Sequence, residues 1–380
     1  MRREITSLTT LRGIAVCFII FHHILLLTTS LGSPTLRGVF GDFSIIAMSL
    51  FFVLSGVVIH YCYSHIATKL EIFAFIQARF ARLFPLYLCF ILVMLILNVS
   101  YLDKNNTSLY MALFPLNLLG AQSWFYAEVS GTHVWYSMLS GNIAWSISTE
   151  AMLYILYIPL AFFMRKLDNL ALTAAAILAL IAILVRISML EMIGHSSPWR
   201  FWITYISPYG RFPEFMLGVC LATIFMEKAK MGYLVKLVWG ASSVLLMVGF
   251  LFIWALKRLG ILNGSLLDSG SFHTLGFLIA LLFVSMALST SFFDKRRGTL
   301  TLYKAGVLSY SAYLLHAFAI IFYSRLNFQH YFNNEFVAMG VILLSSIGLV
   351  FLASKYSYRF IELPGKSALQ RVQLSFRKTK

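Results

Sequence analysis

Charged residues are scarce in this chain of 380 residues: Asp, Glu, Lys and Arg together make up 12% of it, whereas 60% is hydrophobic. An average soluble domain has about 25% charged residues. The shortage of charge therefore argues against a soluble domain, and the long apolar stretches that replace it predict a polytopic membrane protein.

Cysteine is rare as well, and its placement excludes two classes of small-domain scaffold. The four cysteines all lie inside apolar segments, and no two of them have C-x-x-C spacing. Neither a disulfide framework nor a zinc site is indicated, and no metal site is predicted. We interpret Cys17, Cys62, Cys89 and Cys220 as small core residues.

The first apolar segment, residues 11–29, lacks the A-x-A pattern of a signal-peptidase site and is predicted to be an uncleaved first span. A transmembrane helix needs about 20 mostly apolar residues. Ten segments meet this criterion: 11–29, 43–63, 83–99, 143–163, 170–190, 208–226, 234–256, 272–290, 305–323 and 335–354. The predicted fold class is an all-α integral membrane protein, a bundle of about ten transmembrane helices. Residues 109–120 are too short to span and contain a central proline, which favours an interfacial or re-entrant piece.

The distribution of cations predicts the orientation of the bundle. With ten spans both termini share one side, and most Lys and Arg lie on that side. Only eight lie opposite: Arg37, Lys104, Arg186, Arg200, Arg211, Lys257, Arg258 and Arg325. By the positive-inside rule both termini are cytoplasmic. The formal net charge of +16 is then mainly topological, which argues against a nucleic-acid partner.

No soluble domain or internal repeat is evident, so residues 1–366 are predicted to form one transmembrane domain and 367–380 a basic cytoplasmic tail. The largest piece between spans is the external stretch 100–142, which includes WFY at 124–126 and HVWY at 133–136. These aromatics favour stacking on sugar rings. An amphipathic loop resting in the membrane interface explains them equally well.

The first span carries three ionisable residues: Arg12, His22 and His23. Such residues cost about 2.5 to 3.5 kcal/mol to insert, so each is a functional candidate. Eleven residues separate Arg12 from His23, which corresponds to about 16 Å along the helix and to an angular difference of about 20°. His23 therefore shares a face with Arg12, whereas His22 is expected to point elsewhere and to be structural.

Two further spans contain ionisable residues at a depth similar to that of His23. Counting from the predicted outer surface places Glu150 and His316 near that level. Ser146, Glu150 and Tyr154 recur every four residues and are expected to share one stripe of their helix. For His316 the alternative is a structural histidine that hydrogen-bonds to a neighbouring helix.

Two pairs of charged residues lie at the ends of spans. Arg79 and Arg82, in IQARFARLFPLY, share a helical face at the predicted cytoplasmic mouth of the bundle and suit phosphate binding. The alternative is ordinary positive-inside decoration. Arg211 and Glu214 are spaced i, i+3, and either support the acceptor side or form a helix-end ion pair.

Seven stretches together resemble the membrane-bound acyltransferase-3 family, in an order that covers nearly the whole chain. They are TTLRGIAVCFIIFHH at the first span, LFFVLSG at 50–56, RFARLFPLY at 79–87, AWSISTEAMLY at 144–154, RFPEFMLG at 211–218, LSYSAYLLH at 308–316 and YRFIELP at 358–364. One departure is Ser49, where many members have an acidic residue. Some members also carry a fused SGNH-type domain after the last span, where this sequence has a short basic tail.

The resemblance implies a multi-pass enzyme of the bacterial cytoplasmic membrane. It implies transfer of an acyl group, usually acetyl, from cytoplasmic acyl-CoA to a hydroxyl of an extracytoplasmic saccharide or lipid-linked saccharide, such as O-antigen, capsule or exopolysaccharide. Acetyl-CoA is a substrate in this scheme and no resident cofactor is expected. The important family residues map to Arg12, His23, Arg79 and Arg82, and the glutamate of the WSxSxE stretch to Glu150.

These observations predict a division of labour by depth. Arg12, Arg79 and Arg82 bind the phosphates of coenzyme A, and His23 acts as a general base on the acceptor hydroxyl, with Glu150 orienting it or holding the acceptor. The residues assigned to the acceptor side or to support of the site are Ser146, Arg211, Glu214 and His316. A covalent intermediate on His23 or Ser146 is not favoured. The alternative function is a transporter or flippase, and a homo-oligomer is left open.

Overall fold

The structure is a computed structural model of the chain. It describes residues 4–27, 34–102, 104–129, 131–134, 141–167, 170–193, 197–228, 232–258, 269–291, 300–326, 332 and 334–367. Of the predicted basic tail, only Ser367 lies within these ranges, and Trp135 and Tyr136 of the HVWY stretch lie outside them.

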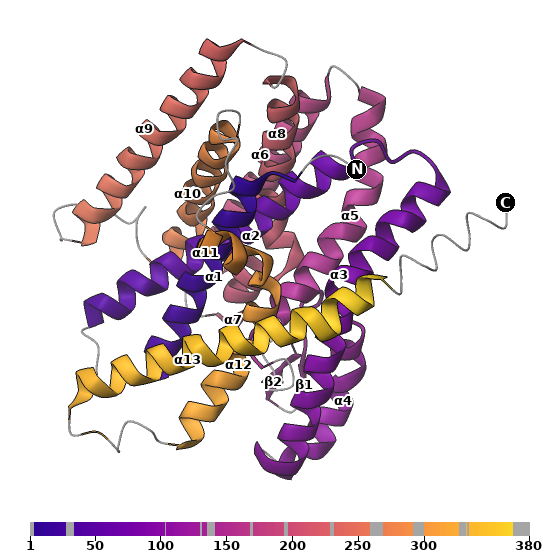
Figure 1. Cartoon of the computed structure of the whole chain (residues 1–380). Coiled ribbons are helices and arrows are strands. Elements are labelled where there is room, and N and C mark those ends of the chain that lie inside the picture. Colours follow the sequence, from indigo (N-terminus) through magenta and orange to yellow (C-terminus); the bar gives the residue numbers. More distant parts are fainter. Residues whose placement is uncertain are drawn as a thin grey trace.

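Helices make up almost all of the described chain, which confirms the predicted all-α class (Figure 1). The long helices are α1 (Thr6–Leu27), α2 (Pro34–Tyr63), α3 (Lys69–Leu97), α5 (Trp145–Leu167), α6 (Ala171–Met192), α8 (Pro208–Lys228), α9 (Tyr233–Arg258), α10 (Ser269–Thr290), α12 (Ser309–Leu326) and α13 (Glu335–Ser357). The short elements are the helices α4 (Thr107–Leu118), α7 (Pro198–Phe201) and α11 (Leu300–Val307), the 3-10 turn η2 (Lys104–Asn106), the π-helical turns η1 (Asn98–Leu102), η6 (Trp202–Ile206) and η9 (Tyr358–Glu362), and the antiparallel strand pair β1 (Glu128–Val129) and β2 (Thr132–His133).

Within the described residues, seven helices are long and apolar enough to cross a membrane, and an eighth span results if α11 and α12 are taken together. Each of the ten predicted segments falls on a helix or, for residues 305–323, on two. The membrane-protein class is therefore confirmed, while the number of ten spans and the cytoplasmic side of the termini stay predictions.

The segment 305–323 is not the single straight helix that its hydropathy predicts. α11 and α12 meet at an angle of 79°. The reason lies in the contact between α11 and α1: a Cβ atom added to Gly306 would lie 1.8 Å from the carbonyl oxygen of Thr9, and one added to Gly13 would lie 2.3 Å from that of Leu302. Two glycines thus let the two backbones touch, and the chain has to turn before α12 continues.

α3 begins well before its predicted span, which changes the position of the two arginines. Thr68 and Glu71 form a reciprocal capping box that starts the helix at Lys69. Arg79 and Arg82 therefore lie within α3, in the turns that precede Pro85.

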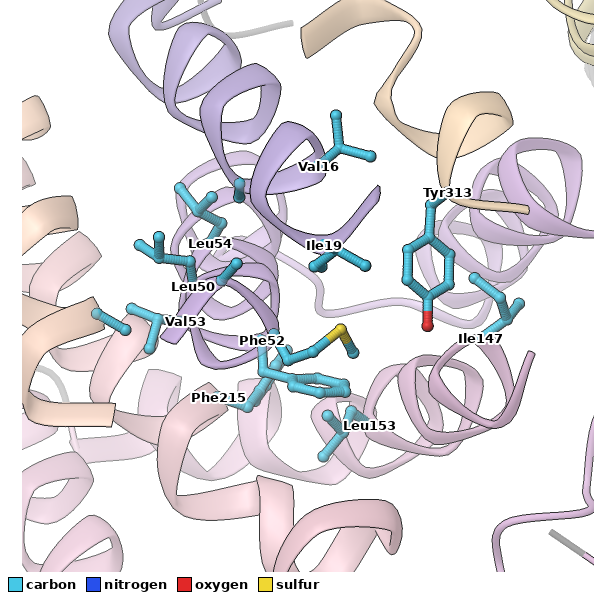
Figure 2. Packing of buried hydrophobic residues seen from close by; sticks show 14 of the residues in the cluster. Val16, Ile19, Leu50, Phe52, Val53, Leu54, Ile147, Leu153, Phe215 and Tyr313 are labelled. Atoms are coloured by element: carbon cyan, nitrogen blue, oxygen red, sulfur yellow. The ribbon is translucent and has the colours of Figure 1, made fainter. Parts of the chain in front are cut away.

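The core of the bundle is the contact between α2 and α8. α1 and α10 pack onto α2, α6 and α5 pack onto α8, and α12 packs against α1. Figure 2 shows Ile19 of α1, Phe52 of α2, Leu153 of α5, Phe215 of α8 and Tyr313 of α12 converging on one another. Lipid offers no hydrophobic drive between helices, so small residues that allow close approach control such packing. α9, at the edge of the bundle in Figure 1, leaves most of its length exposed for lipid contact.

Gly56 tests this close packing. A Cβ atom at Gly56 would lie 2.0 Å from the carbonyl oxygen of Phe215, so Gly56→Ala has to push α2 and α8 apart. We expect this overpacking to destabilise the protein by about 2 kcal/mol or more, measured by unfolding in detergent. Gly249→Ala in α9 is the matched control because nothing lies within 4 Å of its added Cβ. Equal stability of the two variants would contradict the proposed role of the α2–α8 contact.

Candidate functional site

Two cavities that carry ionisable side chains lie within the bundle, and they share part of their walls. The arginine cavity, of about 50 Å³, is lined by Arg12, Arg82, Ser55, Glu150 and neighbouring side chains. The histidine cavity, of about 440 Å³, is lined by His22, His23 and several aromatic side chains. Met48 of α2 and Tyr313 of α12 line both cavities. A layer one side chain thick therefore separates them.

Arginines from two helices face the arginine cavity, Arg12 from α1 and Arg82 from α3. Arg79 lies one turn before Arg82 and within electrostatic range of Arg12. Its Nη2 donates a hydrogen bond to the Tyr63 hydroxyl at 3.0 Å, and its guanidinium lies 5.8 Å from the centre of the Tyr154 ring. The structure thus brings together the three arginines that the sequence assigned to the donor.

The positive charge of these arginines is only partly balanced. Glu150 faces the same cavity, but within the part of the chain that the structure describes Arg12, Arg79 and Arg82 form no ion pair with a carboxylate. Because uncompensated charge in a low-dielectric site is costly, such a group of cations is suited to binding an anion.

The hydrogen bonds of Glu150 go to residues other than His23, so its role in orienting that histidine or in holding the acceptor stays a prediction. Glu150 accepts hydrogen bonds from the Ser55 hydroxyl at 2.7 Å and from the Tyr154 hydroxyl. The physical reason is helical position. Ser146, one turn earlier in α5, donates to the Tyr313 hydroxyl at 2.8 Å and so lies at the layer between the cavities. Glu150 is one turn further toward the arginines.

The partner of His23 is His316. Nδ1 of His23 lies 3.0 Å from the carbonyl oxygen of Ile19 and 3.2 Å from Nε2 of His316, and Nδ1 of His316 bonds to the carbonyl oxygen of Tyr313. A carbonyl oxygen only accepts, so each neutral ring carries its proton on Nδ1. His23 is thereby left with a lone pair on Nε2, in a side chain that lines the histidine cavity.

His22 differs from the prediction that it points away from the site. Its ring centre lies 5.3 Å from that of His23, and it lines the same cavity. Room for it exists because Gly41 faces it from α2, where an added Cβ would lie 3.5 Å from the imidazole. Two neighbouring helical residues thus reach one cavity although they differ by about 100° around the helix.

Arg211 and Glu214 form the predicted ion pair near the start of α8, and this pair is part of a buried charge cluster. Both side chains are fully buried, with Arg211 Nη1 2.7 Å from Glu214 Oε1. Arg186 of α6 adds a second cation at 3.6 Å from the same oxygen. Ser49 donates a hydrogen bond to that oxygen at 3.1 Å. The serine that departs from the family pattern is thus part of this cluster.

The cluster supports one wall of the histidine cavity. The guanidinium of Arg211 lies 4.4 Å from the centre of the Tyr205 ring and 5.9 Å from that of Trp145, and both rings line that cavity. Sequence reasoning missed Arg186, which we counted among the cations of the outer surface. Its position inside the apolar segment 170–190 was the available signal.

The WFY stretch is only partly an exposed platform. Trp124 donates a hydrogen bond to the carbonyl oxygen of Ser148 at 2.9 Å, and the Tyr126 ring packs against Trp202. Phe125 is 58% exposed. Two of the three aromatics therefore anchor this stretch to α5 and η6.

Comparison with protein families adds an independent finding to this geometry. The model of the acyltransferase domain of family 3 matches residues 5–355. This chain belongs to the acyltransferase-3 family. The family spans nearly the whole bundle and supports a multi-pass membrane acyltransferase over the alternative of a transporter or flippase. No curated protein and no solved structure matches the chain.

The buried cluster makes a prediction about stability. Glu214→Gln leaves Arg186 and Arg211 buried without a counter-charge, so we expect a loss of about 3 kcal/mol or more in the free energy of unfolding, measured in detergent. Glu227→Gln, at an exposed position of the same helix, should change it by less than about 0.5 kcal/mol. A Glu214 variant as stable as this control would show that the cluster carries no net ionic stabilisation.

Proposed function

We propose that this acyltransferase is an O-acetyltransferase that moves an acetyl group from cytoplasmic acetyl-CoA to a hydroxyl of a saccharide or lipid-linked saccharide on the other side of a bacterial cytoplasmic membrane. The observation that carries the proposal is the meeting of an arginine-lined and a histidine-lined cavity at Met48 and Tyr313. If the donor enters the arginine cavity and the acceptor enters the histidine cavity from the opposite side, their reacting groups meet at this layer.

The donor side is supported by the charge of the arginine cavity. Arg12, Arg79 and Arg82 are suited to the phosphates of coenzyme A because guanidinium groups bind phosphate oxygens in a bidentate manner. Glu150 is held by hydrogen bonds from Ser55 and Tyr154. Its negative charge attracts the arginines and offsets part of the repulsion between them. The thioester end of the donor extends toward Tyr313.

The size of the arginine cavity supports a short acyl group. The side chains that line this cavity of about 50 Å³ include Phe51, Phe52 and Ile147. These side chains are close to incompressible in a packed core. An acetyl group fits this space more readily than a long acyl chain.

The acceptor side is supported by the lining of the histidine cavity. Trp145, Phe201 and Tyr205 offer aromatic faces, and Ser44 and Asn142 offer polar groups. Sugar rings present apolar C–H faces between hydroxyl groups, so they are bound by such mixtures of aromatic and hydrogen-bonding side chains. Surface saccharides of the O-antigen, capsule or exopolysaccharide kind have this chemistry.

The chemistry then follows from the tautomer of His23. Nε2 takes the proton of the acceptor hydroxyl while its oxygen attacks the thioester carbonyl, and the C–S bond breaks as the new C–O ester bond forms. The imidazolium returns the proton to the departing thiolate. His316 and the Ile19 carbonyl hold the ring in the orientation that this step needs. Ser146 holds Tyr313 at the layer through which the thioester approaches.

His23 is tested against its neighbour in one experiment. Purified protein with acetyl-CoA and an acceptor glycan should release free CoA and give a glycan heavier by one acetyl group. His23→Asn keeps a donor near the Nδ1 position but loses the base, so we expect the transfer rate to fall by about 100-fold or more. His22→Asn should retain transfer within about 10-fold. Wild-type turnover in the His23 variant would refute the mechanism.

The arginines are tested through donor kinetics. Arg79→Ala and Arg82→Ala should each raise the KM for acetyl-CoA by about 10-fold, since a charge-assisted hydrogen bond contributes about 1.5 to 3 kcal/mol, with a smaller effect on the KM for the acceptor. Arg165→Ala, at an exposed position near the end of α5, is the control. Unchanged donor dependence in both the Arg79 and the Arg82 variant would argue against phosphate binding by these arginines.

A further inference from the structure

The C-terminal end of α13 reaches the donor side of the bundle. In Figure 1 α13 crosses α12, and its C-terminal end lies beside α3. There the backbone widens into the π-helical turn Tyr358–Glu362 and then continues as a helical turn through residues 363–367. Pro364 has no N–H to donate to the carbonyl four residues back, which explains why the regular hydrogen-bond pattern changes at this place.

Direct contacts fix this turn against α3 and α12. Gly365 lies so close to α3 that an added Cβ would be 2.7 Å from Cγ of Pro85. Glu362 is buried and accepts a hydrogen bond from the hydroxyl of Ser311, which lies on α12 between the cavity residues Tyr310 and Tyr313. The turn is therefore a built part of the wall behind the arginine cavity.

This arrangement brings a fourth cation to the arginines. Lys366 is half-buried, its Nζ lies 5.6 Å from the centre of the Tyr358 ring, and it is within electrostatic range of Arg79, Arg82 and Glu362. Like charges at this range repel one another. Glu362 offsets only part of that repulsion, because its single negative charge interacts with Arg82 as well as with Lys366.

The cations around the donor side outnumber the carboxylates, and a ligand with several phosphate groups supplies the missing negative charge. Arg12, Arg79, Arg82 and Lys366 face two carboxylates, Glu150 and Glu362. Coenzyme A carries a pyrophosphate and a 3′-phosphate, in total about four negative charges at neutral pH. A flexible lysine at the rim complements arginines deeper in the wall, since an ammonium binds phosphate as a point charge without a fixed angle.

We infer that Lys366 binds the phosphates of the acyl-CoA donor, so that the turn 363–367 completes the donor site. The inference rests on the proposed function, because it assigns a further residue to the same donor. It also gives the YRFIELP stretch, which the sequence singled out without a role, the task of carrying this lysine to α3.

The test compares Lys366→Gln with Lys366→Arg in the full-length protein. The Gln variant should raise the KM for acetyl-CoA and the Kd for free CoA by about 5- to 10-fold with kcat within 2-fold of wild type, and the Arg variant should restore both. Lys355→Gln, an exposed position in the last turn of α13, should leave both unchanged. An unfolding curve of each variant in detergent shows whether the fold is kept.

Dephospho-CoA, which lacks the 3′-phosphate, distinguishes the two phosphate groups. If Lys366 binds the 3′-phosphate, Lys366→Gln weakens binding of CoA but not of dephospho-CoA, and if it binds the pyrophosphate, both are weakened alike. Either result supports the inference. A folded Lys366→Gln variant with wild-type KM and Kd overturns it while the proposed function stands. Wild-type protein that neither binds CoA nor releases it from acetyl-CoA overturns the proposed function itself.

Discussion

The cost of placing cations in a low-dielectric bundle is the constraint on which this structure depends. The bundle meets it in two different ways. Arg186 and Arg211 surround Glu214 and are buried with it, so the carboxylate of Glu214 offsets their charge inside the protein. Arg12 and Arg82 instead line a cavity that they share with Glu150. The first solution supports the fold and the second leaves attraction for an anionic substrate.

The two clusters lie on either side of the layer formed by Met48 and Tyr313, which separates the two cavities. Tyr313 donates a hydrogen bond to the carbonyl oxygen of Ile143 at 2.8 Å and accepts one from Ser146. Its own carbonyl holds His316, which holds His23. The layer between the cavities and the orientation of the His23 ring are therefore parts of one hydrogen-bonded chain. A substitution of Tyr313 would therefore disturb both the layer between the cavities and the orientation of the His23 ring.

Sequence reasoning predicted the candidate site unevenly, and the differences from the structure have a common cause. The three arginines that the sequence assigned to the donor are brought together as expected, because their depth follows from counting along single helices. Glu150 was assigned to His23 because the two have similar depths. Depth alone does not say which face of α5 turns toward α1, and the bond from Ser146 to Tyr313 places Glu150 on the other side of the layer. Arg186 was missed for a related reason, since its partner lies on another helix.

Composition and periodicity by themselves determined that this chain is a helical membrane protein, where its apolar helices lie, and that several of these helices carry ionisable residues at a cost. These are local properties, set by hydropathy and by the 3.6-residue repeat of each helix. The tertiary structure alone decided that His23 meets His316, that two cavities share Tyr313, and that Lys366 reaches α3. These contacts join residues hundreds of positions apart, and they depend on glycine-controlled approach of helices, which no pattern within a single helix encodes.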